Sequence, residues 1–223
     1  MSATASRDAC PPTTSSGPRA TAAEPATGPV APEVSPELRR DLVEIARTAV
    51  QVAVGLASGW SLASRIRHAP GTDLRAAVFV TLTDAGELRG CMGTLDREQP
   101  VAQAVAAASM NAALDDPRFY PVEADEIEDL DVDVSIMGAP VELVAPTDFV
   151  PGVDGIIVER GGRLGLLLPE VAIGHGWDGS RMLEAVCRKA GLPSDAWRSP
   201  GSRCLVFRTV KFGGRVVEDR TTR

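Results

Sequence analysis

Acidic residues outnumber basic ones in this chain, and long apolar runs, aromatic residues and histidines are few. The formal net charge of −7 argues against a general nucleic-acid-binding protein, because phosphate binding requires a basic surface. No apolar run approaches the roughly 18–20 residues that cross a membrane, and the N-terminus lacks the apolar core of a secretory signal. We therefore expect a cytoplasmic protein that binds neither nucleic acid nor membrane.

Cysteines are also few and far apart in the sequence. Without a CxxC pair or paired zinc spacing, they are typical of reduced thiols in a cytosolic protein. No group of His, Cys and acidic residues has the spacing of transition-metal ligands, and the glycines of 155–165 do not form a phosphate-binding loop. We therefore expect no metal and no cofactor. The cysteines are Cys10, Cys91, Cys187 and Cys204.

The length and composition fit one domain of ordinary size with additional segments. The chain has 223 residues, of which 44% are hydrophobic, enough for a core. Residues 1–34 are rich in Ala, Pro, Thr, Ser and Gly without an apolar period, which predicts a disordered tail containing Cys10. We expect the folded domain over residues 35–214 and a flexible C-terminus over 215–223.

Hydrophobic periodicity and turn residues predict alternating helices and strand pairs. Strands that pair as hairpins, with helices between them, favour an α+β fold with a largely antiparallel sheet and flanking helices. The expected elements are a helix from Ser35 to about Gly55, an irregular connection over 60–73, a hairpin over 76–95, a buried helix over 100–114, a strand over 130–136, a second hairpin over 156–168, a helix over 178–190 and a last strand over 203–212.

The segment Leu88–Thr94 places a thiol between two glycines on a predicted strand. Residues two apart on a strand point to the same side, so we expect Arg89 and Cys91 to share a face. A nearby guanidinium favours the reactive thiolate. Gly90 and Gly93 leave room for a ligand or a second backbone beside the sulfur. The alternative is that Cys91 is a small buried hydrophobe, as free cysteines often are.

Two further places contain side chains with possible chemical roles. Asp116 and Arg118 flank Pro117 in a charged corner that either closes over a site or only ends the preceding helix. His175 lies between a strand and a helix, where loops often carry function, so a Cys91–His175 dyad is conceivable. The alternative for His175 is an exposed loop histidine.

Several short blocks occur in a specific order along the chain: Leu88–Thr94, Asp116–Phe119, Val132–Ser135, Gly155–Glu159, Gly165–Pro169, Gly176–Trp177 and Cys187–Gly191. In the order and spacing of these blocks, the chain from about Leu38 to Phe212 resembles the AMMECR1 domain family. The resemblance implies two unequal lobes around an antiparallel sheet, with the Arg-Gly-Cys block lining the cleft between them. The resemblance also implies that the protein accompanies a Memo-type protein and a radical SAM enzyme. Such company implies a role in a modification pathway.

Two functions are consistent with these residues. The first is an enzyme or enzyme component in which Cys91 is the nucleophile, Arg89 stabilises the thiolate or holds an anionic substrate, and Arg118 with Asp116 shapes the rim. The second is a non-catalytic binding module that docks onto a Memo-like or radical SAM partner. It is supported by the small number of general bases near Cys91. The substrate, whether a small molecule or a protein, is not determined by the sequence.

Overall fold

The computed structural model describes residues 28–69 and 73–217. Most of the expected tail, including Cys10, and residues 218–223 lie outside this range. Val34 and Val216 lie just beyond the expected domain of 35–214, yet both are buried against its core. The packed part of the chain therefore extends slightly past those limits, and the disorder of the two ends stays a prediction.

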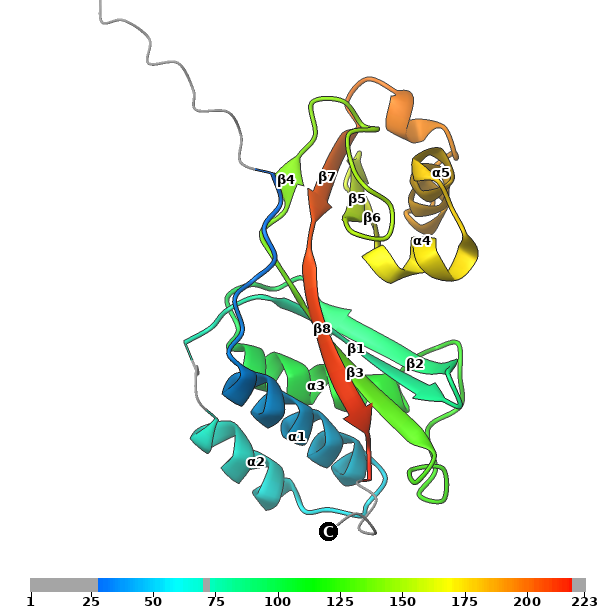
Figure 1. Ribbon diagram of the computed structural model, residues 1–223. Coiled ribbons are helices and arrows are strands. Elements are labelled where there is room, and N and C mark those ends of the chain that lie inside the picture. The colour runs from blue at the N-terminus through cyan, green and yellow to red at the C-terminus, as the bar shows by residue number, and fades with distance from the viewer. Residues whose placement is uncertain (1–27, 70–72, 218–223) are drawn as a thin grey trace, which may run out of the picture.

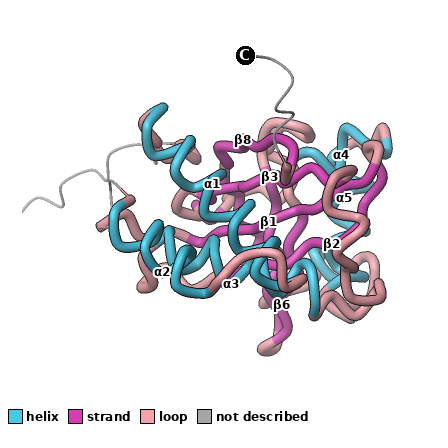
Figure 2. The backbone as a smooth tube through the Cα atoms, turned by 90° about the horizontal axis from the view of Figure 1, so that it is seen from below, coloured by secondary structure: helices cyan, strands magenta, loops and turns pink. Residues whose placement is uncertain are grey.

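Four strands form the first sheet in the order β2-β1-β3-β8, and every neighbouring pair is antiparallel. Helices α1 and α3 cover one face of this sheet (Figure 2). On β1, Val80 and Leu82 are fully buried, whereas Phe79 and Thr81 are only partly buried. The elements of this half are α1 (Pro36–Ala53), α2 (Gly59–His68), β1 (Ala77–Asp84), β2 (Glu87–Thr94), α3 (Val101–Leu114), β3 (Leu130–Met137) and β8 (Thr209–Arg215).

Helix α1 begins where the sequence predicts it. The Ser35 hydroxyl accepts a hydrogen bond from the Leu38 amide at 3.2 Å, and Pro36 occupies the first turn, where its missing N–H costs no hydrogen bond. Leu42 and Ile45 are buried on the face that packs on the sheet and on α3. The cap and the apolar stripe together define this helix.

Helix α2 corrects the expectation of an irregular connection over 60–73. The Ser58 hydroxyl caps it by accepting a hydrogen bond from the Ser61 amide at 3.3 Å. Leu62 is its one buried residue among those described, and Ile66, one turn further on, packs against the same core. This apolar stripe is too short for a periodicity argument to detect. Local capping and packing on α1 and α3 therefore form the helix.

The second sheet has the order β4-β7-β5-β6 and lies on the side of the first sheet opposite α1 and α3 (Figure 1). Helix α5 was expected, and the Asp178 carboxylate caps it by accepting from the Arg181 amide at 2.8 Å. Helix α4 was not expected. The elements of this half are β4 (Val141–Glu142), β5 (Gly155–Arg160), β6 (Arg163–Leu167), α4 (Pro169–His175), α5 (Gly179–Lys189), the 3₁₀ turn Ala196–Arg198 and β7 (Arg203–Phe207).

The expected last strand over 203–212 is two strands that belong to different sheets. The break falls at Arg208, whose carbonyl accepts a hydrogen bond from the Gly138 amide at 2.8 Å. The Arg208 guanidinium donates to Asp154 Oδ1 at 3.0 Å. These contacts hold the chain where it passes from the second sheet to the first (Figure 1).

Each sheet has its own buried cluster, and a third cluster joins them. The α+β class with antiparallel pairing is confirmed, with the strands divided between two sheets. Within residues 28–69 and 73–217, no helix combines the length and apolar character needed to cross a membrane. The third cluster consists of Ala77, Met137, Ile157, Leu166, Leu168 and Phe207.

Candidate functional site

Strand β2 contains a bulge next to the thiol. Thr81 pairs with Cys91 and Leu82 with Gly90, but Thr83 pairs with Leu88, so Arg89 has no partner on β1. A bulge inserts one extra residue and shifts the alternation of side chains beyond it. As a result Leu88 and Cys91 line the same cavity although they are three positions apart.

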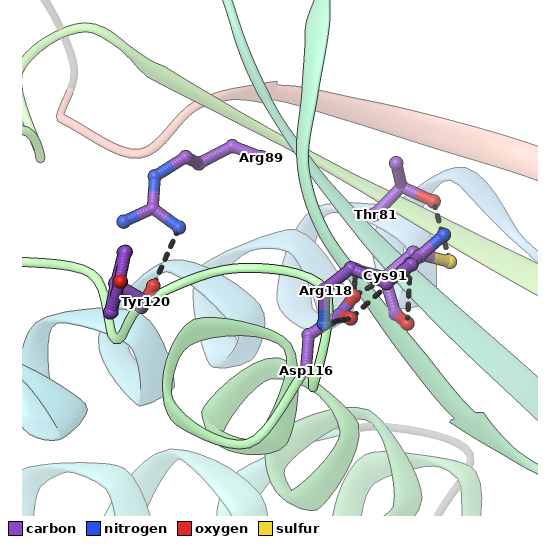
Figure 3. A network of polar contacts seen from close by, with 6 residues as sticks. All are labelled: Thr81, Arg89, Cys91, Asp116, Arg118 and Tyr120. Atoms are coloured by element: carbon purple, nitrogen blue, oxygen red, sulfur yellow. Dashed lines mark hydrogen bonds and ion pairs between the residues drawn. The ribbon is translucent and has the colours of Figure 1, made fainter.

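The expectation that Arg89 and Cys91 share a face is wrong, because the bulge separates them. The Arg89 guanidinium forms a two-point ion pair with Glu126, at 2.7 and 2.9 Å. It also donates to the Tyr120 carbonyl at 2.9 Å, pointing away from the thiol (Figure 3). The hydrogen bond raises the pKa of Arg89 and lowers the pKa of Glu126. Arg89 therefore fastens the segment after α3 and does not line the cavity.

A cavity of about 560 Å³ lies between the two sheets, with Cys91 in its wall. Ligand pockets typically enclose about 300–1,000 Å³, so a small organic molecule fits this space. The first sheet and the segment after α3 line one side, and β6, α4 and α5 line the other. The lining residues are Phe79, Thr81, Leu88, Cys91, Met92, Gly93, Asp116, Pro117, Arg118, Leu166, Leu168, Glu170, Val171, Lys189 and Lys211.

The two glycines beside the thiol have different surroundings. Gly93 lines the cavity, as expected, and a side chain there would meet the Phe79 ring and the Val78 carbonyl. Gly90 faces the opposite way, where an added Cβ would clash with the Ala112 carbonyl of α3. Gly90 therefore serves the packing of β2 on α3, and Gly93 permits the close approach of β2 to Phe79 and to the backbone of β1.

The Cys91 thiol is partly buried and forms no disulfide. Thr81, its partner across the β1–β2 ladder, donates its hydroxyl to Sγ at 3.5 Å (Figure 3). The Cys91 amide donates to Asp116 Oδ2 at 2.8 Å. The thiol is thus fixed at its backbone by the charged corner and on its side chain by a hydroxyl.

Asp116 and Arg118 form the charged corner that the sequence indicated, and both contact the backbone of Cys91. Asp116 is buried and accepts from the Arg118 side chain at 2.6 and 2.9 Å. The Arg118 guanidinium, opposed by desolvation and assisted by the Cys91 amide, holds the pKa of this carboxyl well below its usual range. Arg118 also donates to the Cys91 carbonyl at 3.4 Å. The guanidinium beside the thiol is therefore Arg118 and not Arg89.

Two lysines in the cavity wall were missed by the sequence argument. The Lys211 ammonium lies 3.0 Å from Asp133 and 3.7 Å from Glu170. Partial burial lowers the pKa of Lys211, but these two acids outweigh burial and leave it raised. Lys189 has no hydrogen bond or ion pair among the described residues. Lys189 falls in the block Cys187–Gly191 that carried the family resemblance, which was the one available signal.

His175 lies outside the cavity lining and is not brought to Cys91 in the described structure. It is the last residue of α4 and not part of a loop, and its ring stacks on Trp177 with the centroids 4.4 Å apart. The Cys91–His175 dyad therefore has no support from the geometry.

The described residues also contain no group of three or more His, Cys, Asp or Glu side chains placed to hold a metal ion.

Known proteins are similar to this chain in sequence and in fold. A Methanothermobacter thermautotrophicus protein is 44% identical over 62% of this chain and 75% of its own length. A Methanopyrus kandleri protein is 39% identical over 77% of this chain and 86% of its own. The crystal structure of an uncharacterised Pyrococcus horikoshii protein superposes with a TM-score of 0.73 at 33% identity, covering 81% of this chain and 93% of that one. The AMMECR1 family model matches residues 43–212, so the chain belongs to the AMMECR1 family.

Proposed function

We propose that this AMMECR1-family protein is an enzyme, or a component of one, that uses Cys91 as a reactive thiol toward a molecule held in the cavity. The observation that carries the proposal is the contrast among the described cysteines. Cys187 and Cys204 are buried, and burial raises the pKa of both thiols, to about 11 for Cys204. Cys91 alone of the described cysteines lines a cavity large enough for a ligand.

The surroundings of Cys91 support this role. Arg118 and Lys189 line the same cavity as the thiol and place positive charge in its wall. Gly93, two residues further on, lines the same cavity. Such a site suits the modification pathway that the family resemblance implies, with the reaction itself left open.

Selective labelling of the full chain tests the reactivity. With iodoacetamide and mass spectrometry, we expect Cys91 to react at least about tenfold faster than Cys187 and Cys204. In cells lacking the protein, we expect Cys91→Ala to abolish complementation, while the matched Cys10→Ser variant complements normally. A folded Cys91→Ala protein that complements fully would overturn the proposal.

A second candidate is a non-catalytic module that binds a Memo-like or radical SAM protein. The observation that favours it is the small choice of general bases among the described lining residues. No histidine is present there, and the Asp116 carboxylate is occupied by Arg118 and the Cys91 amide. This candidate predicts that purified Memo-type or radical SAM protein is retained equally by the wild type and by Cys91→Ala. Retention of neither partner, with Cys91 reactive, would eliminate it.

A further inference from the structure

Most of the cavity wall is apolar, which indicates the body of the ligand. Its apolar side chains come from both sheets and from α4, so a bound molecule would contact both halves of the protein. Burying apolar ligand surface against such a wall contributes about 25 cal/mol per Å². These side chains are Phe79, Leu88, Met92, Leu166, Leu168 and Val171.

The charged side chains of the wall are unequal in number, with three basic and two acidic. Arg118 is paired with Asp116 at 2.6 Å. Lys211 is held between Asp133, which lies outside the lining, and Glu170. Lys189 is therefore the one charged side chain of the described lining without an ion-pair partner, in a chain whose net charge is −7.

Lys189 is placed to receive a negative group. It is the last residue of α5, and its ammonium forms no ion pair or hydrogen bond within the part of the chain that the structure describes. Although the side chain is exposed as a whole, desolvation of its ammonium lowers the pKa of Lys189. The charge of Arg118 acts in the same direction, and that of Cys91 opposes it. A cation in this situation gains from an opposite charge that enters with a ligand.

We propose that the cavity binds an amphipathic organic anion, with its carboxylate on Lys189 and its apolar chain along the wall formed by Phe79 and Leu166. This inference rests on the proposed function, because a ligand in this position would lie beside Cys91. The binding itself does not require the thiol, so the two proposals can fail separately. The Asp116 carboxylate is occupied by Arg118, and Glu170 lies 3.7 Å from Lys211, so neither acid is paired with Lys189.

Calorimetric titration of the full chain with octanoate tests the inference, with octanamide as the neutral control of equal size. We expect octanoate to bind at least about tenfold more tightly than octanamide at pH 7, as for one charge-assisted contact. Lys189→Met should remove that difference and leave octanamide binding unchanged. Arg188→Met removes the same charge from the neighbouring residue, which does not line the cavity. This control variant should preserve the difference in affinity between octanoate and octanamide.

Two further variants separate the possible outcomes. Cys91→Ala should bind octanoate within about twofold of the wild type, since a thiol contributes little to an ionic contact. Retained binding together with an unreactive Cys91 would overturn the proposed function only. Equal affinity for octanoate and octanamide, or full octanoate preference in Lys189→Met, would overturn this inference and leave the thiol proposal standing. Lys189→Gln provides the same test if the Met variant does not fold.

Discussion

At the scale of single residues, the Asp116 carboxylate connects the backbone of β2 to the segment after α3. It accepts one hydrogen bond from the Cys91 amide and three from Arg118. Because Asp116 is buried and ionised, these donors replace the water it loses on folding. The position of the thiol therefore depends on a charge contributed from outside its own strand.

Asp116→Ala should lower the free energy of unfolding by about 2 kcal/mol, because it leaves the Cys91 amide and Arg118 without their acceptor. The pKa of Asp116 is lower in the folded protein than in the unfolded chain, so its contribution is complete above about pH 4 and is lost as the pH falls further. The stability difference between wild type and variant should therefore hold from pH 6 to about pH 4 and shrink between pH 4 and pH 3. Urea denaturation of both proteins at several pH values measures this difference in unfolding free energy.

Asp115→Ala is the matched control, because Asp115 is exposed and makes no side-chain hydrogen bond among the described residues. It should change the unfolding free energy by no more than about 0.5 kcal/mol. A difference between wild type and Asp116→Ala that stays constant down to pH 3 would show that the carboxylate charge is not what stabilises this corner.

At the scale of elements, the site depends on how closely β2 approaches α3. Gly90 lies where β2 faces the C-terminal half of α3, with the Ala112 carbonyl directly opposite its Cα. Small alanines on α3 and the absence of a side chain at Gly90 together permit this distance. The approach of helix and strand thus determines where Cys91, one residue further on, enters the cavity.

Gly90→Ala should destabilise the protein by about 2–3 kcal/mol, since its Cβ meets backbone that cannot move aside without shifting α3. It should also change the rate of Cys91 alkylation, because the strand must be displaced. Chemical denaturation and labelling measure the two effects. Gly174→Ala, in α4 with open space around it, is the control and should be neutral or slightly stabilising. A wild-type stability for Gly90→Ala would contradict this account of the helix–strand contact.

At the scale of the whole molecule, the cavity exists because two sheets with separate cores are held together. Phe207 is fully buried at the end of β7, in the cluster shared by both sheets. Gly155 gives it room, because a side chain at Gly155 would overlap the Phe207 ring. The next residue, Arg208, is anchored to Asp154 at 3.0 Å where the chain passes between the sheets.

Phe207→Ala should reduce stability by about 3–5 kcal/mol, the usual cost of removing a buried phenylalanine. Because the lost contacts join the two halves, we also expect hydrogen exchange to rise first at β6 and α4, before the core of the first sheet. Phe207→Leu keeps most of the volume and should cost about 1 kcal/mol. A uniform rise of exchange over both sheets would show that the halves do not separate at this cluster.

The sequence alone determined the local elements and the composition of the corner at Asp116 and Arg118. Caps, turn residues and apolar periodicity depend on neighbours within a few positions, so α1, α5 and both hairpins could be predicted. Helix α2 was missed because its stability comes from capping and from packing on α1 and α3, with only a short apolar stripe. The family blocks also placed Lys189 in a matching segment, although without a role.

Only the tertiary structure decided which charges meet the thiol. The bulge at Arg89 depends on pairing with β1, and strict alternation in the sequence cannot reveal an unpaired residue. Arg118 and Lys189 come to Cys91 from segments 27 and 98 positions away in the chain, through packing of whole elements. The division of the last strand between two sheets likewise depends on contacts of Arg208 with distant residues. Such placements arise from long-range packing, which one strand's pattern does not encode.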